Sequence, residues 1–157
     1  MAQINPNILK YMQGLSEVRA REVLRNEARK LQKIAIKEWR KYLSSYMPKT
    51  YIRTGNAERS IKIGTIKKVD MNHIGIEVTY QNDLVYHDSI MGGKRGHAVM
   101  LISDGWHAKK LEAKMGRVHR LTYFEGTGYL HKVYNEYNKV SPTGVSLDIQ
   151  WSGQYSK

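Results

Sequence analysis

The chain has 157 residues, with 26 Lys and Arg against 14 Asp and Glu, so its formal net charge is +12. This length fits a single domain, and the share of hydrophobic and charged residues argues against wholesale disorder. The absence of cysteine excludes a disulfide framework, a thiol nucleophile and a thiolate metal site. No apolar run is long enough to span a membrane, and the start of the chain lacks the basic and apolar regions of a secretory signal.

Two helices are expected in the first 50 residues. Residues 5–14 predict a short helix, with a capping asparagine, a proline in the first turn and a glycine at the end. A longer helix is expected from Ser16 and Glu17 to about Tyr46, because Pro48 disfavours helical geometry before it. Its apolar residues recur at steps of three and four and form one stripe: Ala20, Leu24, Ala28, Leu31, Ala35, Trp39, Tyr42 and Tyr46.

Positive charge is concentrated on this long helix. Residues 1–50 hold 11 basic and 4 acidic side chains, a net charge of +7, whereas the other 107 residues hold 15 and 10. At about 1.5 Å per residue the helix is roughly 45 Å long, which exceeds what a compact domain of this size needs. We therefore expect a neighbouring subunit to cover part of its stripe and a negatively charged partner to contact its basic face. The candidate partner or DNA contacts are Arg25, Arg29, Lys33, Lys37, Arg40 and Lys41.

Residues 51–80 predict a loop followed by an antiparallel hairpin. Gly55 and Asn56 form the expected turn of the loop. A first strand is expected at about residues 59–68, and a second at residues 74–80, where apolar and polar residues alternate cleanly. In the first strand the residues expected on one face are Ile61, Ile63 and Thr65, and the same alternation extends to Lys67.

Residues 81–125 form an insertion with little regular pattern. A short helix is expected at residues 97–104, where Gly105 would stop it, and residues 117–124 could be extended. Long irregular insertions in a compact domain are commonly binding elements. The candidate partner contacts in this insertion are Gly92, Gly93, Lys94, Arg95, Gly96 and Trp106.

Residues 126–151 predict a second amphipathic helix and a last strand. The helix follows Gly126, Thr127 and Gly128, and the strand at about residues 145–151 is expected beside the hairpin. The expected fold is thus a single α+β domain, in which a long N-terminal helix and a C-terminal helix pack on a small, mainly antiparallel sheet. Its parts are a helical arm (1–50), the hairpin (51–80), the insertion (81–125), and the C-terminal helix with the last strand (126–151).

Catalytic motifs are not found in the sequence. There is no phosphate-binding loop, dinucleotide fingerprint, nucleophile elbow or zinc-protease helix. No two of the six histidines lie within five residues of each other, whereas a metal site needs converging ligands. We therefore expect no cofactor, no metal and no enzymatic activity. A nuclease that uses His87, Asp88 and His107 is one alternative. A free basic nucleic-acid-binding domain is another, although no known reader module is present.

The order of elements resembles the tail-completion, or neck, proteins of long-tailed bacteriophages, which are also called head–tail joining or minor tail proteins. The residues that carry the resemblance follow the long basic helix: Arg53, Thr54, Gly55 and Asn56, and then Arg59, Ser60 and Ile61. In that family a Thr-Gly turn leads from the first long helix into a strand that starts with Ser-Ile. A Glu-Gly-Thr segment follows the second strand, and here Glu125, Gly126 and Thr127 come only after the insertion. The similarity covers roughly residues 17–80.

The resemblance implies a ring-forming structural virion protein that joins the phage head connector to the tail and is assembled in the host cytoplasm. Its implied partners are further copies of the chain, the head-connector and tail-terminator proteins, and double-stranded DNA that passes through the channel, with no membrane. The glycine-rich loop and Trp106 would then contact rings above or below. The family has no catalytic residues to carry over. Another phage ring, such as a tail terminator or a minor capsid protein, remains an open alternative.

Overall fold

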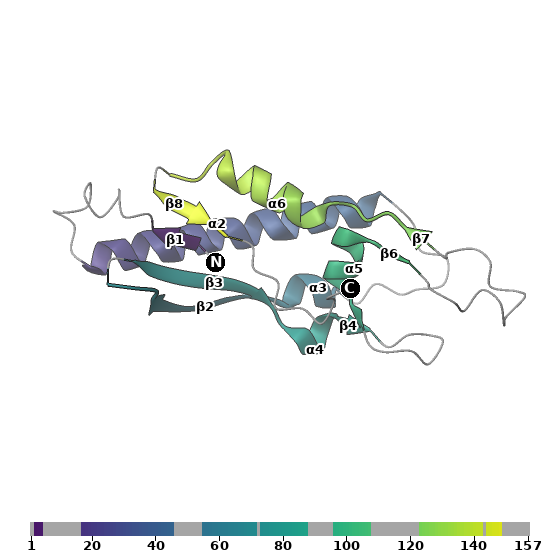
Figure 1. Cartoon of the computed structure of the whole chain (residues 1–157), viewed down its shortest axis with the longest axis horizontal. Coiled ribbons are helices and arrows are strands. Elements are labelled where there is room, and N and C mark those ends of the chain that lie inside the picture. The colour runs from purple at the N-terminus through teal and green to yellow at the C-terminus, as the bar shows by residue number, and fades with distance from the viewer. Residues whose placement is uncertain are drawn as a thin grey trace, which may run out of the picture.

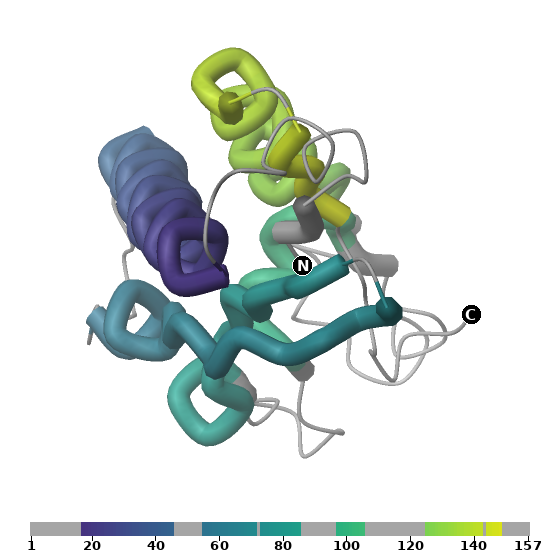
Figure 2. The backbone as a smooth tube through the Cα atoms, turned by 90° about the vertical axis from the view of Figure 1, so that its left-hand side faces the viewer, coloured from purple at the N-terminus to yellow at the C-terminus, as the bar shows by residue number. Residues whose placement is uncertain are grey.

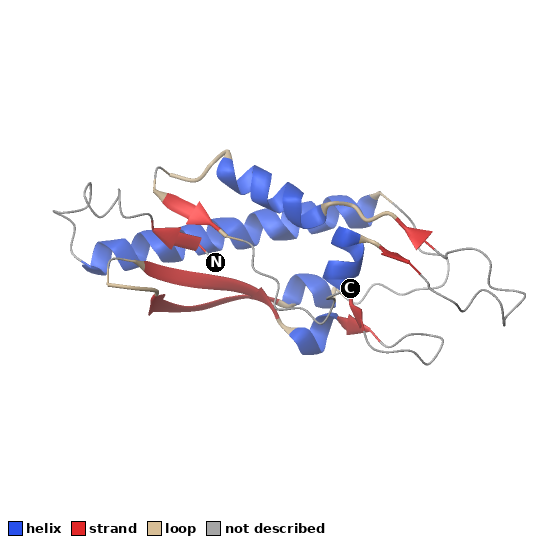
Figure 3. Ribbon diagram, viewed as in Figure 1, coloured by secondary structure: helices blue, strands red, loops and turns tan. Residues whose placement is uncertain are grey.

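The computed structural model describes residues 2–4, 17–45, 55–71, 73–87, 96–107, 123–142 and 144–148. The fold is α+β, as expected, and its elements are arranged along one long axis (Figures 1 and 3). In chain order the elements are β1 (Ala2–Ile4), α2 (Glu17–Ser44), α3 (Asn56–Arg59), β2 (Ile61–Lys68), β3 (Ile74–Tyr80), α4 (Asn82–Val85), β4 (Tyr86–His87), β5 (Gly96–His97), α5 (Ala98–Asp104), β6 (Trp106–His107), β7 (Tyr123–Phe124), α6 (Tyr129–Asn138) and β8 (Val145–Leu147). The helix expected at residues 5–14 lies outside the described residues.

Helix α2 is the longest element, and the rest of the domain is laid along it. It packs against α6 and against β2 and β3 of the sheet, and the end-on view shows these elements around one side of it (Figure 2). Its apolar stripe is between 0% and 8% exposed, at Ala20, Leu24, Ala28, Leu31, Ala35 and Trp39. The expectation that the stripe outruns its own core is therefore wrong for these residues, because the domain is itself elongated in the direction of α2.

The main sheet has four strands in the order β2-β3-β1-β8, and every neighbouring pair is antiparallel. The predicted β2–β3 hairpin is confirmed. The last strand, however, was expected beside the hairpin, and β1 lies between them. Ala2 pairs with Ile76 of β3 on one side and with Leu147 of β8 on the other. A strand of three residues is too short to show alternation, so no sequence pattern predicts β1.

A β-bulge in β2 changes which of its residues face the core. The register shifts between Ile63, opposite Val78, and Ile66, opposite Ile76, so two residues of β2 oppose one residue of β3. Ile66 consequently packs against the core, whereas Thr65 and Lys67 are exposed. Simple alternation had placed Thr65 and Lys67 on the inner face, and that prediction is wrong.

The region expected to be an irregular insertion contains short regular elements. The predicted helix at residues 97–104 is confirmed as α5, and the Nδ1 atom of His97 accepts a hydrogen bond from the backbone N–H of Met100. Gly105 ends α5, as expected. Strands β4 and β5 pair with each other on one side of α5, and β6 and β7 pair on the other.

The segment before α6 is joined tightly to the end of α5. The backbone N–H groups of Thr127 and Gly128 donate to the carbonyls of Ile102 and Ser103, and the Ser103 hydroxyl accepts from the backbone N–H of Leu130. Each helix thereby satisfies terminal groups of the other. Gly126 has a positive φ of 86°, and a Cβ there would lie 2.7 Å from backbone atoms of residues 103–105. Only glycine fits this close approach.

Candidate functional site

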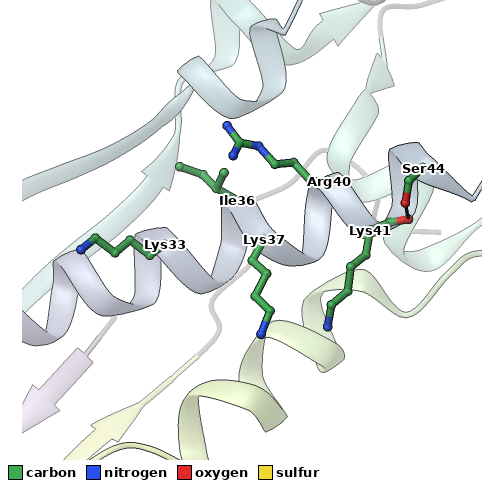
Figure 4. Close-up of a pocket in the computed structure, with 6 residues that line it drawn as sticks. All are labelled: Lys33, Ile36, Lys37, Arg40, Lys41 and Ser44. Atoms are coloured by element: carbon green, nitrogen blue, oxygen red, sulfur yellow. Dashed lines mark hydrogen bonds between the residues drawn. The ribbon is translucent and has the colours of Figure 1, made fainter.

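The outward side of α2 carries a row of exposed cations. Steps of four residues place successive side chains about 6 Å apart along the helix axis, so a row from residue 25 to residue 41 is about 24 Å long. The carboxyl-terminal part of the row lines an open depression of about 710 Å³ (Figure 4). Its lining residues are Lys33, Ile36, Lys37, Arg40, Lys41 and Ser44. The sequence-predicted contacts are all exposed on this helix: Arg25, Arg29, Lys33, Lys37, Arg40 and Lys41.

The inward side of α2 holds two of the four glutamates of the helix, Glu27 and Glu38, which are each 7% exposed. One carboxylate oxygen of Glu27 accepts from Lys30 at 2.7 Å, and the other accepts from the hydroxyl of Tyr137 on α6 at 3.1 Å. Glu38 accepts from Lys41. The helix has nine Lys and Arg against four Glu, and burying two of the glutamates leaves the outward side strongly cationic.

Two of the six predicted contact residues already have carboxylate partners. The Nε and Nη2 atoms of Arg40 both donate to one carboxylate oxygen of Glu58 on α3, at 3.0 and 2.8 Å. The hydrogen bonds that Arg40 donates to Glu58 raise the pKa of its guanidinium, and the hydrogen bond that Lys41 donates to Glu38 raises the pKa of its ammonium. The positive charges of Arg40 and Lys41 are thus partly offset within the chain, and Figure 4 shows them extending toward α3 and α6 respectively.

The other four predicted contacts form what we call the cationic ridge: Arg25, Arg29, Lys33 and Lys37. Within the described residues, no carboxylate lies at ion-pair distance from them. Arg29 donates a long hydrogen bond of 3.4 Å to Asn26. The ridge keeps its positive charge available to a partner.

Two carboxylates nevertheless reduce the field of the ridge. Glu22 is exposed one turn before the ridge, on the same helix. Glu136 of α6 lies within electrostatic range of Lys37. A hydrogen bond from Lys139 is the main reason that the pKa of Glu136 is lowered, and Lys41 and Lys37 add to the effect.

The predicted contacts of the insertion are only partly within the structure. Gly92, Gly93, Lys94 and Arg95 lie outside the described residues. Gly96 pairs with His87 in the β4–β5 ladder, and Trp106 pairs with Phe124 in the β6–β7 ladder. Both ladders lie at the end of the domain where α2 ends, away from β1 and β8 (Figure 1).

The residues of the nuclease alternative are only partly within the structure. His87 and His107 belong to the β4 and β6 ladders, and Asp88 lies outside the described residues. In the part of the chain that the structure describes, no group of three or more His, Asp or Glu side chains could hold a metal ion. Within the same part, none of the helices has both the length and the apolar character that a membrane crossing requires.

Three acidic residues that shape this surface were missed at the sequence level: Glu27, Glu38 and Glu58. A signal existed for two of them. Glu27 lies three residues after Leu24 and Glu38 three residues after Ala35, so helical periodicity places both beside the apolar stripe. Glu58 is 18 residues from Arg40 and meets it only in the folded chain, so no local pattern encodes the pair.

Comparisons of the chain with models of protein families, with curated proteins and with solved structures found no match. The function is therefore argued from the geometry of the α2 surface and from the sequence resemblance.

Proposed function

We propose that this chain is a structural virion protein, a ring-forming neck or tail-completion subunit that joins a phage head connector to the tail. The observation that carries the proposal is the way the described residues from Gly55 onward lead into β2. Gly55 adopts a left-handed conformation with φ 71° and precedes α3, Ser60 ends α3, and Ile61 starts β2. This is the order of turn and strand that the resemblance implies.

The start of β2 is firmly built into the core, which supports a structural role for the segment. Ser60 and Ile61 are 0% and 2% exposed. The Ser60 carbonyl accepts from the backbone N–H of Gln81, and the Ile61 carbonyl accepts from the side chain of Gln32 on α2. These contacts tie the long helix to both ends of the hairpin.

The position of Glu125, Gly126 and Thr127, shortly before α6, departs from the pattern of the family. The resemblance implies a Glu-Gly-Thr segment after the hairpin, and here α4, α5 and two short ladders stand between them. If the two Glu-Gly-Thr segments correspond, the insertion is an elaboration that begins after β3 and ends at the α5–α6 junction.

The ring in this proposal rests on the resemblance, because the stripe of α2 is covered within the chain and needs no neighbour. The cationic outward side of α2 supports contact with a negatively charged component, which in a neck is a neighbouring ring or the DNA in the channel. Virion localisation and the head-connector and tail-terminator partners belong to the same proposal.

Deleting the gene for this chain from the genome that encodes it tests the proposal. We expect electron microscopy to show DNA-filled heads and separate tails, and the supplied protein to restore joined particles. Normally joined particles without the chain would contradict the proposal. Charge reversal at Arg25, Arg29 and Lys33 should also impair joining or DNA retention, whereas reversal at the three exposed lysines of β2, Lys62, Lys67 and Lys68, is the matched control.

A free basic nucleic-acid-binding domain is the second candidate, and the cationic ridge favours it. Light scattering of the purified protein, with and without assembled tails or DNA-filled heads, separates the two candidates. A neck subunit should assemble or join these components. A free binding domain should bind DNA and leave heads and tails unchanged.

A further inference from the structure

We infer that the cationic ridge binds the phosphate backbone of a duplex nucleic acid without reading its sequence. This inference rests on the proposed function, since it names the partner of the same α2 surface. The four side chains of the ridge span about 18 Å along the helix axis, with one cation for each turn. Duplex DNA presents one phosphate for every 3.4 Å of each strand, so several phosphates lie within that span.

The lack of exposed rings on α2 argues that the contact is to the backbone and not to bases. Proteins that bind single strands stack bases on exposed aromatic side chains. The two aromatic residues of α2 are Trp39, which is buried, and Tyr42, which is half-buried. Trp39 packs edge to face on Tyr129 of α6, and its ring is used inside the core. The ridge therefore offers charge without a stacking platform.

The same composition disfavours an acidic protein as the partner. The centres of protein interfaces are rich in aromatic residues and poor in lysine. The ridge has two lysines and two arginines, and the apolar residue beside it, Ile36, is half-buried. A contact of this kind gains its affinity from counterion release, which a dense polyanion such as duplex DNA provides.

Salt dependence of binding measures the number of phosphates contacted. The probe is a duplex of about 30 base pairs of mixed sequence, titrated by fluorescence anisotropy between about 50 and 200 mM salt. The test variant combines Arg25→Gln, Arg29→Gln and Lys33→Gln. The control combines Lys62→Gln, Lys67→Gln and Lys68→Gln on β2, where all three lysines are exposed. Both variants lower the net charge by the same amount.

Each lost phosphate contact should flatten the slope of log affinity against log salt by about 0.9, so the test variant should lose about 2.7. Over this salt range that corresponds to a salt effect about 40-fold smaller than in the wild type. The control should keep the wild-type slope. A second duplex of unrelated sequence should bind with the same affinity.

Each of the following results would overturn the inference. Equal flattening in both variants would show that net charge alone matters. Tighter binding to single-stranded oligothymidine, or preference for one duplex sequence, would show base contacts. Stronger competition by polyglutamate than by unlabelled duplex would indicate an acidic protein partner. If DNA binding fails while the chain still joins heads to tails, only this inference falls. If DNA binding holds while joining does not need the chain, the proposed neck function falls.

Discussion

The two sides of α2 use charge in opposite ways. On the inward side, Glu27 and Glu38 are buried and paired, and small or apolar residues fill the contact with α6 and the sheet. On the outward side, Arg25, Arg29 and Lys33 have no carboxylate partner among the described residues. The difference shows how one helix can hold a domain together and present a binding surface. Substitutions on the inward side should therefore change the free energy of unfolding, whereas substitutions on the outward side should change the binding of a partner.

The largest effect is expected from Leu24→Ala on the inward side. Leu24 is 0% exposed, and removing its buried methyl groups leaves a cavity, so the free energy of unfolding should fall by about 2–5 kcal/mol. The neighbouring exposed change Arg25→Ala should alter it by no more than about 0.5 kcal/mol. Urea denaturation measures both. If Leu24→Ala and Arg25→Ala lowered the free energy of unfolding equally, the two sides of α2 would not differ in their contribution to stability.

The next largest effect is expected from Tyr137→Phe. The hydroxyl of Tyr137 donates to the buried carboxylate of Glu27, and losing this bond leaves a carboxylate oxygen unsatisfied. The free energy of unfolding should fall by about 1–3 kcal/mol. Tyr134→Phe is the matched control, because Tyr134 is exposed on the same helix. A Tyr137→Phe protein as stable as this control would show that the buried bond contributes nothing.

Alkaline pH should lower the free energy of unfolding, because three tyrosines lie where β3 and α6 pack against α2. Burial is the main cause that raises the pKa of the Tyr80, Tyr129 and Tyr137 hydroxyls. Their contribution to stability is complete below the unfolded pKa of about 10 and is lost as pH rises, because the unfolded chain releases protons that the folded chain keeps. The loss should approach about 1.4 kcal/mol per pH unit for each tyrosine.

Tyr129→Phe tests this dependence on pH. The variant loses the hydrogen bond from Tyr129 to the Ala35 carbonyl, so it should be less stable at every pH. Its stability should nevertheless fall less steeply above pH about 10 than that of the wild type. Urea midpoints over this range give the slopes. Identical slopes would mean that Tyr129 ionises as freely in the folded chain as in the unfolded one.

The smallest change in stability is expected from Glu58→Gln, which releases Arg40 from its partner on the outward side. Exposed ion pairs contribute little to stability, so the thermal midpoint should move only slightly. DNA binding should gain one cation, and the salt slope should steepen by about 1. An unchanged slope would confine the binding surface to the cationic ridge.

Much of this fold could be predicted from hydrophobic periodicity. The long helix was expected from residue 17 to about residue 46, and α2 spans Glu17–Ser44; the second hairpin strand has the expected bounds. What failed depended on pairing between distant segments. Strand β1 forms because Ala2–Ile4 pair with β3 and β8, and Ile66 reaches the core because β2 shifts its register against β3. The three residues of β1 are too few to show alternation, and the bulge in β2 has no local sequence signal.

The candidate surface was predictable in its charge and not in its pairing. The charge pattern predicted six exposed basic contact residues on α2, and all six are exposed. Two of them, Arg40 and Lys41, form ion pairs with Glu58 and Glu38. The stripe was also expected to need a neighbour, because a compact shape was assumed for the domain. Periodicity gives the direction of each side chain on its helix, whereas pairing depends on where other elements are placed.

The close fit of Gly126 against the end of α5 also bears on how this architecture can vary among related chains. Segments 88–95 and 108–122 each begin and end at strands that are paired with each other, β4 with β5 and β6 with β7. Lengthening such a closed segment adds only a slowly growing entropic cost. We therefore expect insertions between these paired strands to be tolerated, whereas an insertion between Gly126 and α6 should disturb the hydrogen bonds of Thr127 and Gly128 to the end of α5.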